Sequence, residues 1–109
     1  MQLSDLKPKW ITEARDDGSA RWTKDDENGL SAQAIVFLCR KCFAENHGPV
    51  GTHSIIVPFA NRGVPDGYMP SMPRWNAVGA TFDTLSLTPS ILLIGGCGWH
   101  GFITNGEVT

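Results

Sequence analysis

The chain has 109 residues, a formal net charge of −2, 12 glycines, 7 prolines and 3 cysteines. This length fits one domain, and no apolar stretch approaches the ~20 residues that span a bilayer. The slightly negative charge argues against broad nucleic-acid binding, which requires a clustered basic surface. An odd number of cysteines does not suit a disulfide framework, and the first residues lack the regions of a signal peptide. We therefore expect a cytoplasmic protein with neither a nucleic-acid nor a membrane partner.

The first third of the chain is polar and predicts a hairpin. Residues 10–12 and 20–23 contain the aromatic and β-branched residues of short strands, and they flank Asp16-Asp17-Gly18, a turn signal. The charged stretch 24–28 predicts a surface loop. We expect a single domain, 1–109, in which 1–33 form this hairpin and a polar linker and 34–109 form the core.

Two strands and a long loop are predicted in the middle of the chain. Residues 34–38, Ala-Ile-Val-Phe-Leu, predict a buried strand that leads into Cys39. Residues 52–59 predict a second strand, which its proline ends. Residues 61–73 contain three prolines and two glycines, and they predict an irregular excursion of the kind that serves as a lid or binding loop.

The last third predicts more short strands. Residues 74–78 and 81–87 are typical of short strands or turns, and the apolar run 91–94 predicts a strand that follows a break at Thr88-Pro89-Ser90. Residues 99–104 lead into Asn105-Gly106, a strong signal for a two-residue hairpin turn, and a return strand. No convincing amphipathic helix is present. The predicted fold is mainly β, a small zinc-stabilised domain with long loops.

All three cysteines fall into two short motifs. Cys39-Arg-Lys-Cys42 is a C-x2-C pair, and Cys97-Gly-Trp-His100 is a C-x2-H pair with glycines around it. Two such zinc knuckles, brought together by folding, supply the four soft or borderline ligands of a tetrahedral zinc site. The fourth ligand is His100 or, less favoured, His53. Four protein ligands would make the single zinc ion structural, whereas a site of three cysteines would leave room for a bound water.

Several motifs in order resemble those of the small BubE-like family. They are Phe-Leu-Cys-x-x-Cys at 37–42, Thr-His-Ser-Ile at 52–55, Arg-Trp-Asn at 74–76, Thr-Pro-Ser-Ile-Leu-Leu at 88–93 and Cys-Gly-Trp-His-Gly-Phe-Ile-Thr-Asn-Gly at 97–106. Relatives are phage and prophage proteins and components of bacterial ubiquitin-like modification operons. Many phage relatives carry further Cys and His residues after the last hairpin, and this sequence lacks them, so its ligand set can differ from theirs.

The resemblance implies a compact zinc-containing β protein and a serine-type peptidase that acts on a ubiquitin-like protein or its precursor. Ser90 is the candidate nucleophile, because it occupies the matching position of the Thr-Pro-Ser motif. The base is His53 if His100 binds zinc, and His100 if it does not. Asn76, Asp83 and Glu45 are candidates to orient the histidine, and the sequence does not choose among them.

A second hypothesis is a non-catalytic phage or mobile-element protein whose zinc only builds a surface for a protein partner, in the cytoplasm of the bacterium or host. The large aromatic residues are expected to serve as core and zinc cover rather than as a ligand cage. These residues are Trp75, Phe82, Trp99 and Phe102.

Overall fold

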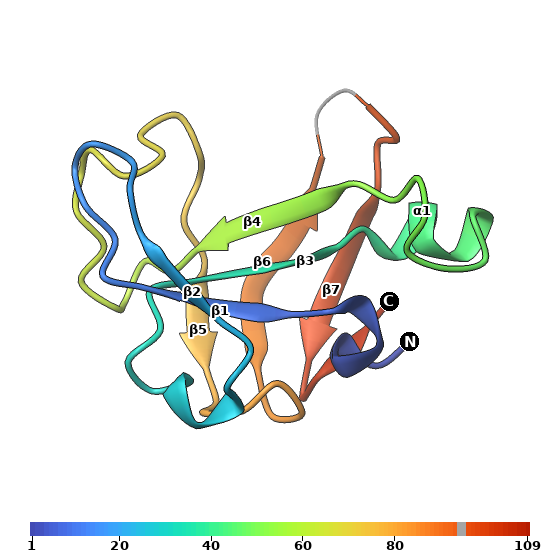
Figure 1. The fold of residues 1–109 in the computed structure, drawn as a ribbon, viewed down its shortest axis with the longest axis horizontal. Coiled ribbons are helices and arrows are strands. Elements are labelled where there is room, and N and C mark those ends of the chain that lie inside the picture. The colour runs from blue at the N-terminus through green and yellow to red at the C-terminus, as the bar shows by residue number, and fades with distance from the viewer. Residues whose placement is uncertain (94–95) are drawn as a thin grey trace.

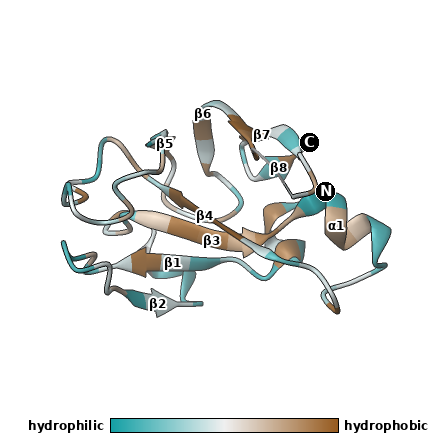
Figure 2. Cartoon of the chain, turned by 90° about the horizontal axis from the view of Figure 1, so that it is seen from above, coloured by the Kyte–Doolittle hydropathy of each residue, from teal (hydrophilic) through white to brown (hydrophobic). Residues whose placement is uncertain are grey.

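Two antiparallel sheets dominate the computed structural model, which describes residues 1–93 and 96–109 (Figure 1). The strands are β1 (Lys9–Thr12), β2 (Arg21–Thr23), β3 (Ala34–Leu38), β4 (Ser54–Pro58), β5 (Asn76–Val78), β6 (Ser86–Leu92), β7 (His100–Thr104) and β8 (Glu107–Val108). The first sheet has the order β2-β1-β3-β4 and the second the order β5-β6-β7-β8. Figure 2 shows the two sheets as two stacked layers. The mainly β prediction is confirmed.

Helices are short in the described part of the chain. Two 3-10 turns, η1 (Leu3–Leu6) and η2 (Asp26–Asn28), accompany one α-helix, α1 (Arg40–Glu45). The sequence did not predict α1, which begins directly after Cys39 at the end of β3. None of the described helices has the length and apolar character needed to cross a membrane.

The main core fills the space between the two sheets. Trp10 and Ile35 lie opposite each other on β1 and β3, and both are completely buried, as is Ile103 on β7. Trp10 also stacks on Phe82 with ring centroids 4.6 Å apart. Successive side chains of a strand point to opposite faces of the sheet. The residues of β6 and β7 that alternate with the buried ones therefore face outward.

Most predicted elements of the first sheet are confirmed. β1 and β2 form the predicted hairpin, and β3 has the predicted bounds, 34–38. The second predicted strand is shorter than 52–59, because β4 starts only after His53. Residues 61–73 contain no strand or helix, as expected. The guanidinium of Arg74 holds this loop by donating to the carbonyl oxygens of Val64, Pro65 and Tyr68.

The second sheet differs from the prediction in one place. The expected break at residues 88–90 is wrong, since β6 continues through Pro89. Its pairing with β7 shifts register between Leu87 and Ile91, and a proline is tolerated at such an irregularity because no ladder hydrogen bond is required there. Ile94 of the predicted run lies outside the described residues. The Asn105-Gly106 turn is confirmed, with positive φ at both positions.

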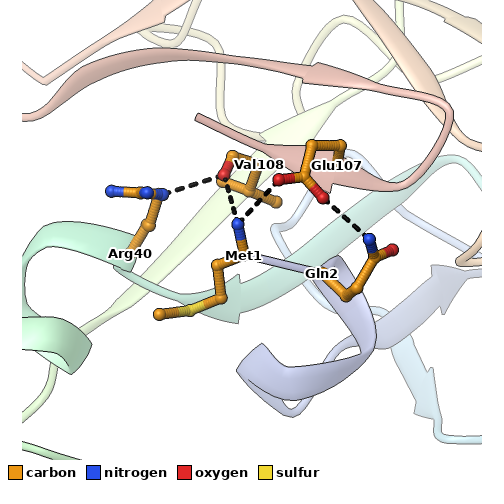
Figure 3. Close-up of polar contacts among 5 residues, drawn as sticks. All are labelled: Met1, Gln2, Arg40, Glu107 and Val108. Atoms are coloured by element: carbon orange, nitrogen blue, oxygen red, sulfur yellow. Dashed lines mark hydrogen bonds and ion pairs between the residues drawn. The ribbon is translucent and has the colours of Figure 1, made fainter.

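The N-terminal segment, α1 and β8 are joined by polar contacts (Figure 3). The Met1 ammonium donates to Glu107 Oε1 at 2.8 Å, and Gln2 Nε2 donates to Glu107 Oε2 at 2.8 Å. Arg40 Nε donates to the carbonyl oxygen of Val108 at 2.8 Å. Through these bonds, the start of α1 is fixed against the sheet that carries β7.

Candidate functional site

Three cysteines and one histidine converge at one end of the molecule. Sγ atoms of Cys39, Cys42 and Cys97 and a ring nitrogen of His53 all lie within 4.8 Å of one another. Cys39 is the buried N-cap of α1 and Cys42 lies in its first turn. His53 immediately precedes β4, and Cys97 lies in the connection between β6 and β7. The group could hold a metal ion.

The spacing of these atoms fits a tetrahedral zinc site. Cys39 Sγ and Cys97 Sγ are 3.5 Å apart, and Cys97 Sγ and His53 Nε2 are also 3.5 Å apart. Zinc bonds of typical length in a tetrahedron separate two sulfurs by about 3.8 Å and a sulfur from a nitrogen by about 3.6 Å. Three thiols and one imidazole form a common structural zinc set, so the chemistry of the donors and their geometry agree.

Backbone hydrogen bonds hold the segments that carry these side chains. Cys39 N–H donates to the carbonyl oxygen of His53 at 3.0 Å, and Phe43 N–H donates to that of Cys39 at 2.9 Å. Lys41 Nζ donates to the carbonyl oxygen of Cys97 at 2.9 Å. The first bond continues the β3–β4 ladder by one residue, which is why His53 faces the cysteine pair.

The three thiols differ in their acidity. A hydrogen bond from the Trp99 backbone, followed by one from His53, lowers the pKa of Cys97 to about 7. Burial raises the pKa of Cys42 to about 12 and also raises the pKa of Cys39. Without a metal, negative charge therefore concentrates on Cys97, whereas a bound cation favours the thiolate at all three positions.

Ser90 and His100 meet on the outer face of the second sheet. His100 Nε2 and Ser90 Oγ are 2.9 Å apart. His100 is the first residue of β7 and pairs with Leu92 of β6, so Ser90 lies diagonally across the strand pair. Along β7 the residues Gly101 and Ile103 are buried, whereas those at 100, 102 and 104 are exposed. This alternation turns His100 toward solvent and away from the core.

The surroundings of the pair are partly aromatic. Trp75 Nε1 donates to the carbonyl oxygen of Ser90 at 3.1 Å, which fixes the backbone that carries the hydroxyl. Phe102 lies beside His100 with ring centroids 6.3 Å apart. Trp75, Phe82 and Trp99 are buried, as expected, but Phe102 is 53% exposed. The expectation that Phe102 belongs to the core is wrong, because it shares the outer face with His100.

The three candidates to orient the histidine lie in different places. Asn76 begins β5 and pairs with Thr88 on β6. Asp83 lies in the turn before β6, and its backbone is next to Gly106, at the opposite end of β7 from His100. Glu45 is the last residue of α1. Within residues 1–93 and 96–109, no hydrogen bond joins His100 to any of the three.

The structure divides the two candidate histidines between two sites. It brings His53 to the three cysteines, and it does not bring His100 to them. His100 instead contacts Ser90. From the sequence, His100 was the favoured fourth ligand, and this geometry reverses that order of preference. The reason is local: Cys97 precedes β7, whereas His100 already belongs to the strand and follows its alternation.

These features define a small two-sheet β protein with a potential metal centre and a serine–histidine pair on neighbouring strands. Residues 7–109 match the model of a family described as the bacterial ubiquitination-like system serine protease, BubE, and the chain belongs to this family. No curated protein and no solved structure matches the chain.

Proposed function

We propose that this chain is a serine-type peptidase of a bacterial ubiquitin-like system, with Ser90 as nucleophile and His100 as general base. The observation that carries this proposal is the 2.9 Å separation of His100 Nε2 and Ser90 Oγ on an exposed face. A serine hydroxyl becomes an effective nucleophile when an imidazole within hydrogen-bond reach accepts its proton. The family description supports the same chemistry.

The pair supports a two-step hydrolysis. Ser90 Oγ attacks the scissile carbonyl carbon while His100 Nε2 takes the hydroxyl proton, and His100 then returns this proton to the departing amine. The bond between carbonyl carbon and nitrogen breaks, which leaves an ester on Ser90. Water activated by the same imidazole hydrolyses the ester and restores both side chains.

We assign the metal centre a structural role and propose zinc as its ion. Cys39, Cys42, His53 and Cys97 would fill all four positions around a tetrahedral ion, whereas catalytic zinc keeps one position open for water. When bound, zinc supplies cross-links rather than reaction chemistry. Because Cys97 lies three residues before His100, the cross-link also fixes the start of β7, from which the proposed base projects.

The family description supports a proposal for the substrate. A serine protease of a ubiquitination-like system would cleave the bond that follows the terminal segment of a ubiquitin-like protein, either in its precursor or in a conjugate. The protein partner is therefore also the substrate in this proposal.

Hydrolysis by matched serine variants tests the proposal. A bacterial ubiquitin-like protein fused at its terminus to a reporter peptide is incubated with the unmutated chain, Ser90→Ala and Ser86→Ala. Ser86 lies on the same strand, and its hydroxyl accepts a hydrogen bond from Asn105 N–H at 2.9 Å, so it controls for loss of a β6 hydroxyl. We expect Ser90→Ala to abolish cleavage while metal content and folding remain intact. Undiminished cleavage by Ser90→Ala removes Ser90 from the mechanism.

One observation favours a second candidate function, a non-catalytic protein-binding surface. Val78, Leu92 and Phe102 are 60%, 54% and 53% exposed, and all three lie on strands of the second sheet at positions that face away from the core. Apolar side chains exposed on the same face of a sheet offer a surface that a protein partner can cover. This candidate predicts a stable complex with a partner and no hydrolysis by the purified chain, so turnover of the fusion protein excludes it.

A further inference from the structure

An apolar groove runs from the metal centre toward Ser90. It consists of two adjoining clefts of about 320 and 290 Å³, which share Ile55, Ile56, Met72 and Leu93 among their lining residues. One end reaches His53. The other end is lined by Trp75, the residue whose indole N–H holds the carbonyl oxygen of Ser90. The groove thus ends at a side chain that contacts the backbone of Ser90, although neither Ser90 nor His100 lines it.

One wall of the groove is a strand edge that is open at its start, whereas its end is bonded to Trp75, whose N–H donates to the carbonyl oxygen of Pro58 at 3.0 Å. β4 is the last strand of its sheet. The carbonyl oxygen of His53 accepts from Cys39 N–H, and the N–H of Phe59 donates to the carbonyl oxygen of Gln33, the two residues that flank β3. By alternation, the polar backbone groups of residues 55 and 57 also face β3. Those of Ser54 and Ile56 consequently face away from the sheet. An edge of this kind accepts a further strand.

The opposite wall is also incompletely paired. β5 pairs with β6 only at residues 86–88, so within residues 1–93 and 96–109 no strand pairs with the later part of β6 on that side. Leu93 N–H donates to the carbonyl oxygen of Trp99, toward β7, so the backbone groups of Leu92 face the other way, toward the groove. Ser90 lies two residues before Leu92, and its carbonyl oxygen faces the same side, where it accepts the hydrogen bond from Trp75 Nε1.

The remaining border comes from the irregular loop at 61–73. Met69 and Met72 of this loop line the groove, and thioether side chains adapt to different apolar partners. His53 is the only titratable residue that lines either cleft in the described part of the chain. The groove therefore offers apolar side chains together with the backbone donors and acceptors of β4 and β6 that no described strand pairs.

We infer that this groove binds, as an added β-strand, an extended peptide segment that precedes the scissile bond and carries apolar residues at alternate positions. Unpaired edges recognise an extended backbone, and alternate side chains of a strand point to the same side. The segment before the scissile bond is the part that a precursor and a conjugate share. The inference rests on the proposed function, because it takes Ser90 as the reaction centre.

Peptide selection by an inactive variant tests the groove without relying on catalysis. Immobilised Ser90→Ala protein is equilibrated with a positional-scanning library of capped octapeptides, and bound peptides are identified by mass spectrometry. We expect enrichment of Leu, Ile, Val or Met at every second position. N-methylation of the amides of one alternate set is expected to weaken binding at least tenfold, because it blocks strand pairing, whereas N-methylation of the other set is tolerated.

A pair of charge-introducing variants locates the binding site. Met72→Glu in the Ser90→Ala background places a carboxylate in the groove and is expected to weaken binding of the selected peptide at least tenfold. Leu30→Glu introduces the same charge at a residue that is 74% exposed and does not line the groove, so it should not affect binding. Thermal melting of both variants verifies that they fold.

The outcomes separate the two proposals. Enrichment without period-two apolar preference, equal tolerance of both N-methylated sets, or full binding by folded Met72→Glu overturns the groove assignment. Selection of the expected peptides, combined with resistance of the fusion protein to the unmutated chain, retains the groove and contradicts the peptidase. Cleavage of the fusion protein that is unaffected by Met72→Glu, introduced here into the chain that retains Ser90, retains the peptidase and contradicts the groove.

Discussion

Removal of the metal should cost a large part of the folding free energy. Cys39 and Cys97 are 58 positions apart in the sequence, and a shared ion closes this loop as a cross-link does. For a loop of this length, the chain-entropy relation gives about 14 cal/mol/K, or about 4 kcal/mol at 25 °C. Domains of this size have stabilities of roughly 5–15 kcal/mol, so the melting temperature should fall by about 15–20 °C.

Thermal unfolding followed by circular dichroism, before and after chelation, measures this loss. Elemental analysis of the same samples confirms that the ion was present and was removed. His53→Ala should reproduce the low melting temperature of the chelated protein, and His100→Ala should retain the response of the unmutated chain to chelator. A melting temperature that stays unchanged after verified removal of the metal refutes the assignment of a structural cross-link.

Three further predictions follow from particular residues. His100→Gln should reduce kcat for the fusion substrate by about 10²–10⁴-fold, the usual contribution of a general base, with unchanged metal content; a loss smaller than tenfold argues against its role as the base for Ser90. In metal-free protein, the lowered pKa of Cys97, about 7, should make this thiol the first to react with iodoacetamide, with a rate that rises as pH approaches and passes 7; mass mapping that finds another cysteine modified first contradicts this electrostatic interpretation. Gly106→Ala should lower the melting temperature, because the residue has a φ of 74° and an added Cβ would lie 2.7 Å from backbone atoms of Asp83; an unchanged melting curve refutes that close approach.

Local sequence was sufficient for elements with a strong pattern. Residues 34–38 are apolar throughout and β-branched in the middle, so the strand and its bounds were predictable. Asn105-Gly106 has the residues that a two-residue turn with positive φ requires. Helix α1 was missed because its six residues bury no side chain and are too few to show a helical period. The path of β6 through Pro89 was missed because tertiary pairing decides it.

The site residues were predictable as a set, but their division between two sites was not. The predicted strand at 99–104 places His100 on the same face as Phe102 by alternation, but the direction of Cys97 depends on the turn before the strand, where Gly98 has a φ of 66°. The approach of His53 to Cys39 depends on antiparallel pairing of β3 and β4, which no local pattern specifies. The groove depends on which strand edges stay open, and this too follows only from the complete topology.

The division of the two histidines is the claim on which the proposed mechanism depends. Its most direct test is the zinc-to-protein ratio of purified His100→Ala, measured by elemental analysis beside the unmutated chain and His53→Ala. We predict that His100→Ala retains the ratio of the unmutated chain and that His53→Ala loses its zinc. Loss of zinc from His100→Ala, with zinc retained by His53→Ala, would contradict it.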